Sequence, residues 1–512
     1  MKRSRCSLFL APTLLAASCV TSAAPDVAPT PESGQTAAAT ALRQYGSLQF
    51  SPCTLSAQLS TLNVDAYCSH LEVPENREAP DGRKISLAIA WIASDNTQAA
   101  PDPVFFIAGG PGQSALESYP QVHTAFREVL KHHQVVLVDQ RGTGDSNPLV
   151  CKDADGANAI AEEDAATDPT AWRDFAERCA NELGEHADLR FYTTTDATAD
   201  LDAVREALGV AQINLLGVSY GTRVAQQFLQ HYPQSTRSVV LDSVVPNTLI
   251  LGAEHARNLE ASLDQQFALC GENSVCRERF GNPRERLNAL VAELKAAPRV
   301  VSYRDPLTAE LREENLTAGH VALLARMYAY MPSLGGSLPL VLSEAANGHA
   351  EPMIAQAKML GESLTESIMH GMQLSVLCAE DEPLLQADPA DADRLLGLEM
   401  VTLTKEQCAV WPRGRMPEDF HNAVSSDTAT LILSGEFDPV TPPRYGDEVV
   451  KTLSRGRHLI LRGQGHSVAS IGCMPRLLGE FFKSADAQAL DASCLDTLKA
   501  TQPFAGYYGW EP

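Results

Sequence analysis

The sequence predicts an α/β fold whose sheet is mostly parallel, flanked by helices and interrupted by a long helical insertion. Two short runs, 104–108 and 134–138, are almost continuously apolar, as in strands buried on both faces of a sheet. A third run, 213–216, lies between two segments whose apolar residues recur at helical spacing. Buried strands that alternate with helices in this way indicate a parallel sheet with helices packed on it. A chain of 512 residues is long enough for such a core and for a substantial insertion.

The first 24 residues have the three-part layout of a secretory signal peptide. Three basic residues precede an apolar run at 8–17, which is too short to span a membrane, and small residues follow it. Cleavage after 21–23 would give a soluble exported protein, whereas the lipoprotein-like sequence at 15–19 would make Cys19 a lipidated first residue. Both outcomes stay open. Both predict an exported protein that is periplasmic, anchored in the outer membrane or secreted.

The composition limits the classes of partner. Residues 25–42 are rich in Ala, Pro, Thr and Ser and lack apolar periodicity, which predicts a flexible tether. No later run approaches the roughly 20 apolar residues that a membrane helix needs, so a membrane is expected as a partner only through the lipid anchor. The formal net charge of -24 argues against nucleic acid as a partner, because no basic face could dominate such a field.

The cysteines predict disulfides and no metal site. Two of the 12 cysteines lie in the leader, an even number remains, and the sequence contains no C-x-x-C. In an oxidising compartment this usage is typical of a disulfide framework, although the sequence alone does not fix the connectivity. Cysteines that are neighbours along the chain are expected to pair, which gives Cys53–Cys68, Cys151–Cys179, Cys270–Cys276, Cys378–Cys408 and Cys473–Cys494.

Glycine-rich turns follow the first two buried runs, after two alternating segments at 69–73 and 84–91 that are themselves predicted strands. The turns are 109–114 and 139–146. In the first turn the Gly110 N–H can approach a ligand closely, so it is a candidate donor to an oxyanion. The alternative is a loop that uses glycine only to turn tightly. Neither turn has the spacing of a phosphate cradle, and no cofactor is expected.

The pentapeptide Gly217-Val218-Ser219-Tyr220-Gly221 lies between the strand at 213–216 and a helix that begins near Thr222. In a strand–turn–helix elbow the central residue has a strained backbone, and glycine is needed on both flanks because a side chain there would collide with the turn. Such an elbow exposes the Ser219 hydroxyl and directs the Tyr220 N–H toward an oxygen that becomes negative beside it. A serine in an ordinary βα turn is the alternative, and the flanking elements favour the elbow.

Between 249 and 406 the alternation of strands and helices stops and helical patterns take over. One helix is predicted to begin at Pro283, and another to include 321–328. The sheet resumes with strands at 430–434 and 458–461. The expected domains are a signal peptide (1–24), a tether (25–42), the first part of an α/β core (43–248), a helical cap (249–406) and the C-terminal part of the core (407–512).

A serine hydroxyl becomes a good nucleophile only when a base takes its proton and a third group orients that base. Asp438 and His466 each follow a strand of the resumed sheet, which gives the order Ser, acid, His that α/β-hydrolase sheets use. We expect Asp438 to hold the tautomer of His466, and His466 to take the proton of Ser219 and pass it to the leaving group. Glu436 is the rival acid in the same loop. His132 and His133, which have no carboxylate near them in the sequence, are expected to be surface residues and not metal ligands.

These motifs together resemble the prolyl aminopeptidase and tripeptidyl aminopeptidase family of serine peptidases. The resemblance rests on five motifs in order, which are Gly109-Gly110-Pro111-Gly112, 139–146, 217–222 and the Asp438 and His466 loops. It extends from Cys68 to Cys494 and includes the Cys473 and Cys494 pair. Ala108 stands where prolyl aminopeptidases usually have histidine, which favours the tripeptidyl type. The resemblance implies an α/β-hydrolase fold and release of short pieces from the free N-terminus of a peptide, with the cap limiting substrate length.

An exopeptidase of this kind must bind the ammonium group of its substrate in a partly dry site, and that requires carboxylates. Glu380 and Asp381 are the candidates, because the expected Cys378–Cys408 bridge would tie their segment to the core; a plain charged loop is the alternative. Two other functions remain compatible with the sequence. One is a carboxylesterase of the same fold, since the fold does not decide the substrate. The other is an exported binding protein without catalysis, against which the intact serine, aspartate and histidine argue.

Overall fold

The computed structural model describes residues 42–57, 61–153, 156, 159 and 169–506, and these contain a sheet of ten strands and a second sheet of two. The signal peptide, Cys19 and almost all of the tether lie outside the described residues. The order of the large sheet is β1-β2-β3-β4-β6-β5-β7-β8-β11-β12. Six of its strands, from β6 to β12 in that order, pair in parallel, and β1 to β4 pair antiparallel. The mostly parallel sheet that the sequence predicts is therefore confirmed.

The predicted strands coincide with strands of the sheet, but the sequence did not predict the first two. The antiparallel strands are β1 (Arg43–Tyr45), β2 (Leu48–Ser56), β3 (Asn63–Pro74) and β4 (Lys84–Ile92). The parallel strands are β5 (Val104–Ile107), β6 (Val135–Val138), β7 (Ile213–Val218), β8 (Thr236–Asp242), β11 (Ala429–Gly435) and β12 (Gly456–Leu461). In β2 only Leu48, Phe50 and Leu55 are buried, so no apolar run marked it.

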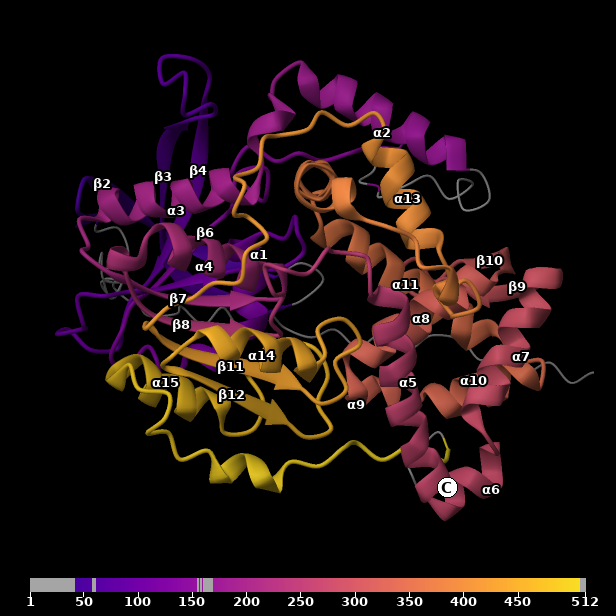
Figure 1. Cartoon of the computed structure of the whole chain (residues 1–512). Coiled ribbons are helices and arrows are strands. Elements are labelled where there is room, and N and C mark those ends of the chain that lie inside the picture. The colour runs from indigo at the N-terminus through magenta and orange to yellow at the C-terminus, as the bar shows by residue number, and fades with distance from the viewer. Residues whose placement is uncertain (1–41, 58–60, 154–155, 157–158, 160–168, 507–512) are drawn as a thin grey trace, which may run out of the picture. The chain divides into compact units, whose positions relative to one another are not determined.

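The core lies on both faces of the sheet, as strand β5 illustrates. Its Phe105 and Ile107 belong to one hydrophobic cluster, while Val104 and Phe106 belong to the other. The first cluster is covered by α2 (Pro169–Gly184), α3 (Thr194–Leu208), α4 (Tyr220–His231) and α14 (Pro443–Val449). The second cluster is covered by α1 (Ala115–Val122) and α15 (Met474–Ser484), so helices α3 and α15 lie on opposite sides of the strands in Figure 1.

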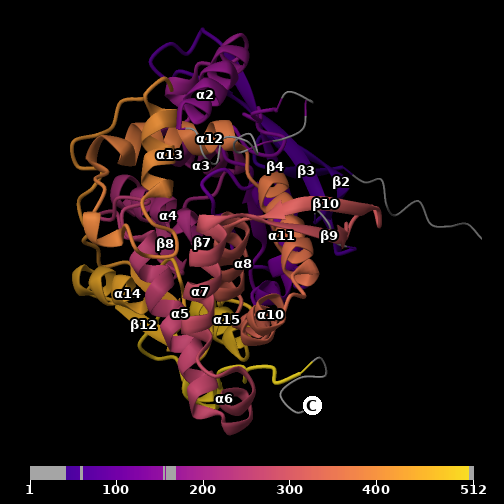
Figure 2. The same cartoon turned by 90° about the vertical axis from the view of Figure 1, so that its right-hand side faces the viewer.

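The insertion between β8 and β11 has a hydrophobic cluster of its own, to which Leu263, Leu290, Leu324 and Ile354 contribute. Figure 2 shows its elements gathered together. They are α5 (His255–Glu272), α6 (Ser274–Phe280), α7 (Pro283–Ala296), β9 (Arg299–Arg304), β10 (Leu311–Leu316), α8 (Ala318–Tyr330), α9 (Pro332–Gly335), α10 (Leu338–Ala346) and α11 (Glu351–Ser367). We call residues 249–367 the cap. Its β9–β10 hairpin departs from the expected all-helical block; in β9 only Val301 and Tyr303 are buried, which leaves little apolar signal.

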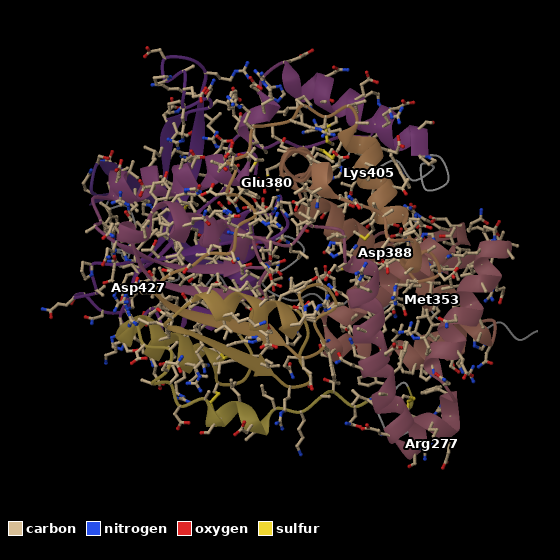
Figure 3. All side chains as sticks on the ribbon, in the orientation of Figure 1. Arg277, Met353, Glu380, Asp388, Lys405 and Asp427 are labelled. Carbon is tan, nitrogen blue, oxygen red and sulfur yellow. A yellow bond between two sulfur atoms is a disulfide. The ribbon has the colours of Figure 1, made fainter. Side chains whose placement is uncertain are left out.

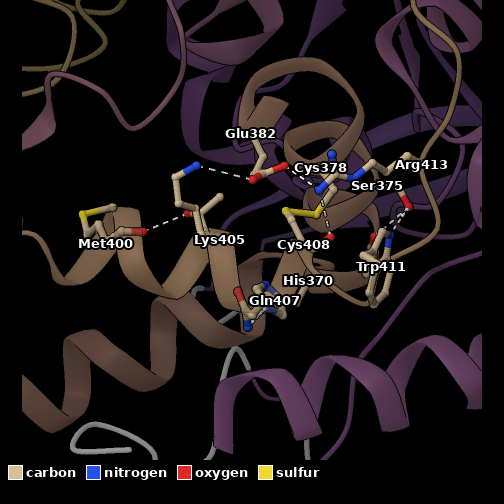
Figure 4. The surroundings of a disulfide bond; sticks show 12 residues. His370, Ser375, Cys378, Glu382, Met400, Lys405, Gln407, Cys408, Trp411 and Arg413 are labelled. Carbon is tan, nitrogen blue, oxygen red and sulfur yellow. Dashed lines mark hydrogen bonds and ion pairs between the residues drawn. A yellow bond between two sulfur atoms is a disulfide. The ribbon is translucent and has the colours of Figure 1, made fainter. Parts of the chain in front are cut away.

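Helices α12 (His370–Val376) and α13 (Glu399–Cys408) follow the cap and pack differently. Met372, Leu374 and Val376 belong to the cluster of the main sheet, not to that of the cap. The Cys378–Cys408 disulfide joins the segment after α12 to the end of α13 (Figure 4). Around it Glu382 pairs with Lys405 at 3.5 Å and with Arg413 at 2.6 Å. This segment is therefore anchored to the core.

The five disulfides of the structure join the pairs that the sequence predicts. They are Cys53–Cys68, Cys151–Cys179, Cys270–Cys276, Cys378–Cys408 and Cys473–Cys494. Cross-links of this size each contribute about 2–4 kcal/mol to stability in a chain-entropy account. In the described part of the chain, no group of three or more His, Cys, Asp or Glu residues is arranged to hold a metal ion. Nor does that part contain a helix long and apolar enough to cross a membrane.

His133 departs from its expected place on the surface. Its side chain is buried, and its Nδ1 lies 3.1 Å from the carbonyl oxygen of Asp102 and 3.6 Å from the carboxylate of the same residue. This contact could not be predicted from the sequence because Asp102 is 31 residues away and lies just before β5. The expectation of an exposed histidine without a carboxylate neighbour was therefore wrong for His133.

Candidate active site

Ser219 lies at the sharp turn between β7 and α4, with φ 55° and ψ −124°. This backbone conformation is strained for a residue with a side chain. A Cβ atom on Gly217 would overlap the carbonyl oxygen of Gly221, and one on Gly221 would overlap the carbonyl oxygen of Ile107 at the end of β5. Both flanking positions thus require glycine, for the steric reason that the sequence suggested. The turn is an elbow that lifts Ser219 above the ends of the parallel strands.

A buried aspartate, Asp242 at the end of β8, connects this elbow to the loop that carries His466. The Ser219 N–H donates to the Asp242 carbonyl oxygen at 2.9 Å. The Asp242 carboxylate accepts hydrogen bonds of 2.9 Å from the N–H groups of both Val468 and Ala469. Burial raises the pKa of Asp242, and these N–H groups oppose the shift. Asp242 was not among the residues predicted from the sequence; an acidic side chain that ends an apolar strand is the signal that could have found it.

Asp438 and His466, which the sequence paired, are in contact. The Asp438 Oδ2 lies 2.8 Å from His466 Nδ1. Asp438 also accepts hydrogen bonds from the N–H groups of Val440 at 2.9 Å and Thr441 at 2.8 Å, and from the Thr441 hydroxyl at 2.8 Å. The rival acid Glu436 is turned elsewhere, since its Oε2 accepts a hydrogen bond of 2.8 Å from the Gly463 N–H. Of the two acids in this loop, Asp438 is the one that orients the imidazole.

The two partners change each other's pKa in opposite directions. Burial alone would lower the pKa of His466, but the charge and hydrogen bond of Asp438 outweigh it and raise that pKa above its ordinary value. Burial alone would raise the pKa of Asp438, but the charge and hydrogen bond of His466 and the backbone N–H groups lower it. An aspartate that stays ionised beside a histidine of raised basicity is the arrangement that general-base catalysis requires.

The first glycine-rich turn lies against the elbow. A Cβ atom on Gly109 would be 3.1 Å from the Cβ of Ser219, and Gly110 has φ 108°, which favours glycine. The Tyr220 N–H begins helix α4 beside the same serine. Gly110, one of the expected oxyanion donors, thus follows the glycine that approaches the Ser219 side chain. Tyr220, the other expected donor, directly follows Ser219 in the sequence. Donors in such a place stabilise a negative oxygen at a carbonyl carbon attached to the serine.

The second glycine-rich turn supports the first. The buried carboxylate of Asp139 accepts hydrogen bonds from the Ser114 hydroxyl at 2.6 Å and the Leu116 N–H at 3.0 Å, at the start of α1. It also accepts one of 3.2 Å from the Asp145 N–H in its own turn. Burial raises the pKa of Asp139 to about 6. This carboxylate therefore fixes the two turns relative to each other.

The cap contacts the loops of both the acid and the base. The His466 N–H donates to the carbonyl oxygen of Tyr330, the last residue of α8, at 3.0 Å, and the two rings meet edge to face with centroids 5.1 Å apart. On α5 the Ser262 hydroxyl donates to the Phe437 carbonyl oxygen at 2.6 Å, and the Asn258 amide donates to the Val440 carbonyl oxygen at 2.9 Å. None of these contacts was predicted from the sequence. Two polar residues four apart on the buried face of α5 are the signal that could have found them.

Two basic residues of the cap also lie near His466. His255 begins α5, and burial, together with the positive charges of Arg326 and His466, lowers its pKa to about 3. Arg326 lies on α8, and its guanidinium carbon is 6.0 Å from the centre of the Tyr330 ring. The charge of Arg326 opposes the raised pKa of His466. His255 is therefore a neutral group beside the candidate base, and Arg326 is a cation there.

Glu380, labelled in Figure 3, and Asp381 are the candidates for binding a substrate amine, and both are buried, with exposures of 2% and 0%. The Glu380 carboxylate accepts hydrogen bonds from the N–H and hydroxyl of Thr194 at 2.7 and 2.9 Å. The Asp381 carboxylate pairs with Arg223 of α4 at 2.9 Å and accepts the Leu251 N–H at 2.8 Å. In this structure both carboxylates are occupied by protein groups. Their role toward a substrate amine stays a prediction, without a contact that supports it.

The Glu380 contact extends to the elbow. Burial raises the pKa of Glu380 to about 8, while the positive charge of Arg223 opposes that shift. The Thr194 hydroxyl that bonds Glu380 is also 2.6 Å from the Tyr220 hydroxyl. The segment after α12 is thus connected through Thr194 to the residue that follows Ser219.

Comparison with known proteins gives two family matches, the first of which extends from the core into the cap and the second of which begins after the cap. Residues 102–301 match the alpha/beta hydrolase fold family, and residues 395–494 match the family described as TAP-like protein. The first match contains the elbow, and the second contains the acid and base loops. The two matches therefore cover the segments that the structure brings together.

Several individual proteins are similar to this chain. The serine protease Hip1 of Mycobacterium tuberculosis is 26% identical over 456 residues, which cover 83% of this chain and 86% of that protein. The tripeptidyl aminopeptidase of Streptomyces lividans is 33% identical over 190 residues, 35% of each chain. Among solved structures, the proline iminopeptidase of Mycobacterium smegmatis aligns with 82% of this chain and 100% of its own, at 15% identity and a TM-score of 0.39.

Proposed function

Since this chain belongs to the α/β-hydrolase serine peptidases of the prolyl and tripeptidyl aminopeptidase family, we propose that it is an exported exopeptidase. Its substrates are peptides with a free N-terminus, from which it releases short pieces. Ser219, His466 and Asp438 form the catalytic triad, and the backbone N–H groups of Gly110 and Tyr220 form the oxyanion hole.

In the proposed mechanism His466 takes the proton of the Ser219 hydroxyl while the oxygen attacks the scissile carbonyl carbon. The imidazolium that forms is stabilised by Asp438, which remains ionised. His466 then protonates the leaving amine, and the C–N bond breaks to leave an acyl-enzyme on Ser219. Water, deprotonated by the same imidazole, attacks the acyl carbon and releases the new carboxylate. The Ser219 hydroxyl has no hydrogen bond within the described residues, and in serine hydrolases without substrate the bond to the base is often long and tightens on binding.

The observation that carries the exopeptidase proposal is the direct contact of the cap with the base. Tyr330 of the cap is hydrogen-bonded to the backbone of His466 and packs against its ring. A cap held this close to the base obstructs a long chain that would have to pass on both sides of the reacting bond, and so favours a substrate that enters by its end. The names of the related proteins, a serine protease and a tripeptidyl aminopeptidase among them, support a peptide as the substrate.

A panel of chromogenic substrates tests this proposal. Purified protein is offered aminoacyl, dipeptidyl and tripeptidyl anilides with free amines, the same anilides with blocked amines, and a nitrophenyl ester. Cleavage of unblocked anilides alone supports the exopeptidase. Turnover of the ester without cleavage of any anilide favours the alternative, an exported carboxylesterase of the same fold, and cleavage of blocked anilides contradicts the requirement for a free N-terminus.

Export is part of the proposal, and the disulfides support it, because such a framework persists in oxidising compartments. Mass spectrometry of the mature N-terminus decides between the two processing sites. A diacylglycerol mass on Cys19 indicates a lipoprotein, and an unmodified N-terminus at Ala24 indicates a soluble exported protein. Recovery of the full-length chain with an intact leader from the cytoplasm contradicts export.

A further inference from the structure

Arg326 is a cation near His466 that has no anionic partner among the described residues. It lies on α8 one turn before Tyr330, the residue that contacts His466. Its Nη1 is 3.4 Å from the sulfur of Met400, and its guanidinium carbon is 6.0 Å from the centre of the Tyr330 ring. Among the residues that the structure describes, no carboxylate forms an ion pair with it. The side chain is only partly exposed, so water alone does not fully solvate the charge.

The carboxylates nearby are already paired with other arginines. Met400 and His255 line a pocket together with Asp388, Asp391 and Leu398. In this pocket Asp388 and Asp391 both bind Arg257, at 2.9 and 3.2 Å, and Asp391 also binds Arg394 at 2.7 Å. Arg326 contacts the wall of the pocket only through a thioether, which is a weak acceptor. In the part of the chain that the structure describes, Arg257 and Arg394 thus each have an anion, and Arg326 has none.

The charges around Arg326 are consistent with a role in binding an anion. The positive charge of Arg326 acts against the protonation of His466 and of His255. His255 does not supply an anion to Arg326 either, because it is a neutral imidazole in the first turn of α5, an 18-residue helix. The N-terminal end of such a helix carries a partial positive charge. The surroundings of Arg326 therefore favour a negative group beside Tyr330, the cap residue that contacts His466.

We propose that Arg326 binds a carboxylate of the peptide substrate and so makes the enzyme selective for substrates that carry one at this place. The inference rests on the proposed function and adds to it the chemical class of the substrate. A guanidinium presents a planar pair of donors that matches a carboxylate, and such charge-assisted bonds are stronger than neutral ones. The carboxylate can belong to an acidic side chain of the released piece or to the C-terminus of a short peptide. Both present the same chemistry to Arg326.

Binding to the Ser219→Ala protein tests the inference without turnover. Isothermal titration calorimetry compares tri-alanine with its C-terminal amide, and tri-alanine amides carrying Glu with those carrying Gln at each position in turn. We expect one of these comparisons to favour the carboxylate by about 10-fold to 100-fold in Kd. Adding Arg326→Gln should abolish that preference and leave the Kd of the neutral peptide unchanged. Equal binding in every comparison, or a preference that survives Arg326→Gln, overturns the inference.

Kinetic measurements on proteins that retain Ser219 distinguish a failure of this inference from a failure of the proposed function. At a pH above the acidic limb of the profile, Arg326→Gln should raise KM for the carboxylate-bearing substrate and leave KM for the neutral substrate unchanged. Arg279→Gln, which removes the same charge from an exposed residue of α6, is the matched control and should leave KM unchanged for both substrates. Hydrolysis with no carboxylate preference in the wild-type enzyme supports the exopeptidase and overturns the role of Arg326. Selective binding by the Ser219→Ala protein, together with no hydrolysis of any peptide by the wild type, supports the role of Arg326 and overturns the exopeptidase.

Discussion

The elbow and the two loops that face it are held in place by different kinds of contact. At the elbow the backbone itself sets the conformation, because Gly217 and Gly221 are the only residue type that fits between neighbouring carbonyl groups. The loops of Asp438 and His466 are held by hydrogen bonds from far along the chain, including those of Ser262 and Tyr330 in the cap. The proposed nucleophile is thus fixed by the residues next to it in the sequence, whereas the proposed acid and base also depend on contacts with the cap. This comparison predicts that changes at the elbow abolish activity, and that changes in the cap tune it.

The most severe test of the comparison is Ser219→Ala. Removal of the hydroxyl should lower kcat by several orders of magnitude, as in other triads. Because no described residue hydrogen-bonds the Ser219 Oγ, the thermal unfolding temperature should not change. Anilide hydrolysis and a thermal scan measure the two effects. Activity close to that of the wild type would refute the assignment of Ser219 as the nucleophile.

A methyl group at the elbow should act on both structure and activity. In Gly221→Ala the new Cβ meets the carbonyl oxygen of Ile107, so β5 and α4 must separate. We expect a loss of about 3 kcal/mol or more in the free energy of unfolding, as for other overpacked backbone sites, and a loss of activity in whatever protein folds. The matched control is Gly271→Ala in α5, where an added Cβ meets nothing within 4 Å. An equal effect of the two substitutions would remove the steric basis of the elbow.

Removal of a cap contact should have an intermediate effect. Ser262→Ala deletes the hydrogen bond to the Phe437 carbonyl oxygen beside Asp438. Misplacement of a catalytic group by a fraction of an ångström lowers kcat by about 10-fold to 100-fold. Ser484→Ala removes a hydroxyl that donates to a backbone carbonyl in exposed surroundings on α15 and should leave kcat unchanged. If Ser262→Ala changes stability but not kcat, the cap does not position the acid.

The smallest expected effect is a shift of the pH profile. Protonated His466 cannot accept the Ser219 proton, so kcat/KM rises as the pH passes the pKa of His466. That pKa is raised mainly by Asp438 against the effect of burial, so the acidic limb should lie above the ordinary histidine value of about 6.5. Arg326 opposes the protonation, and Arg326→Gln should therefore move the limb to higher pH. A limb that stays in place or moves to lower pH would contradict a charge effect of Arg326 on the base.

The sequence could predict the elements whose determinants are local. The elbow, the order of Ser219, Asp438 and His466, and the cysteine pairs all follow from neighbouring residues or from their order in the chain. What it could not predict depends on long-range packing. Asp242 supports the His466 loop through contacts 226 residues away, and Glu380 meets Thr194 across 186 residues. Strand β2 and the β9–β10 hairpin were missed because their exposed faces are polar and their buried residues too few to form a pattern.

The hydrogen bond between Tyr330 and the backbone of His466 links substrate entry to the competence of the site. Movement of α8 away from His466 would break this bond and free the histidine loop to shift. If the cap moves to admit a substrate, the base is therefore out of place until the cap closes again, and closing becomes a step of each turnover. Loop and domain closures of this kind take microseconds to milliseconds and often set the rate. On this account kcat falls as the viscosity of the solvent rises. A folded protein whose chain end cannot enter the site is never presented with a correctly placed His466.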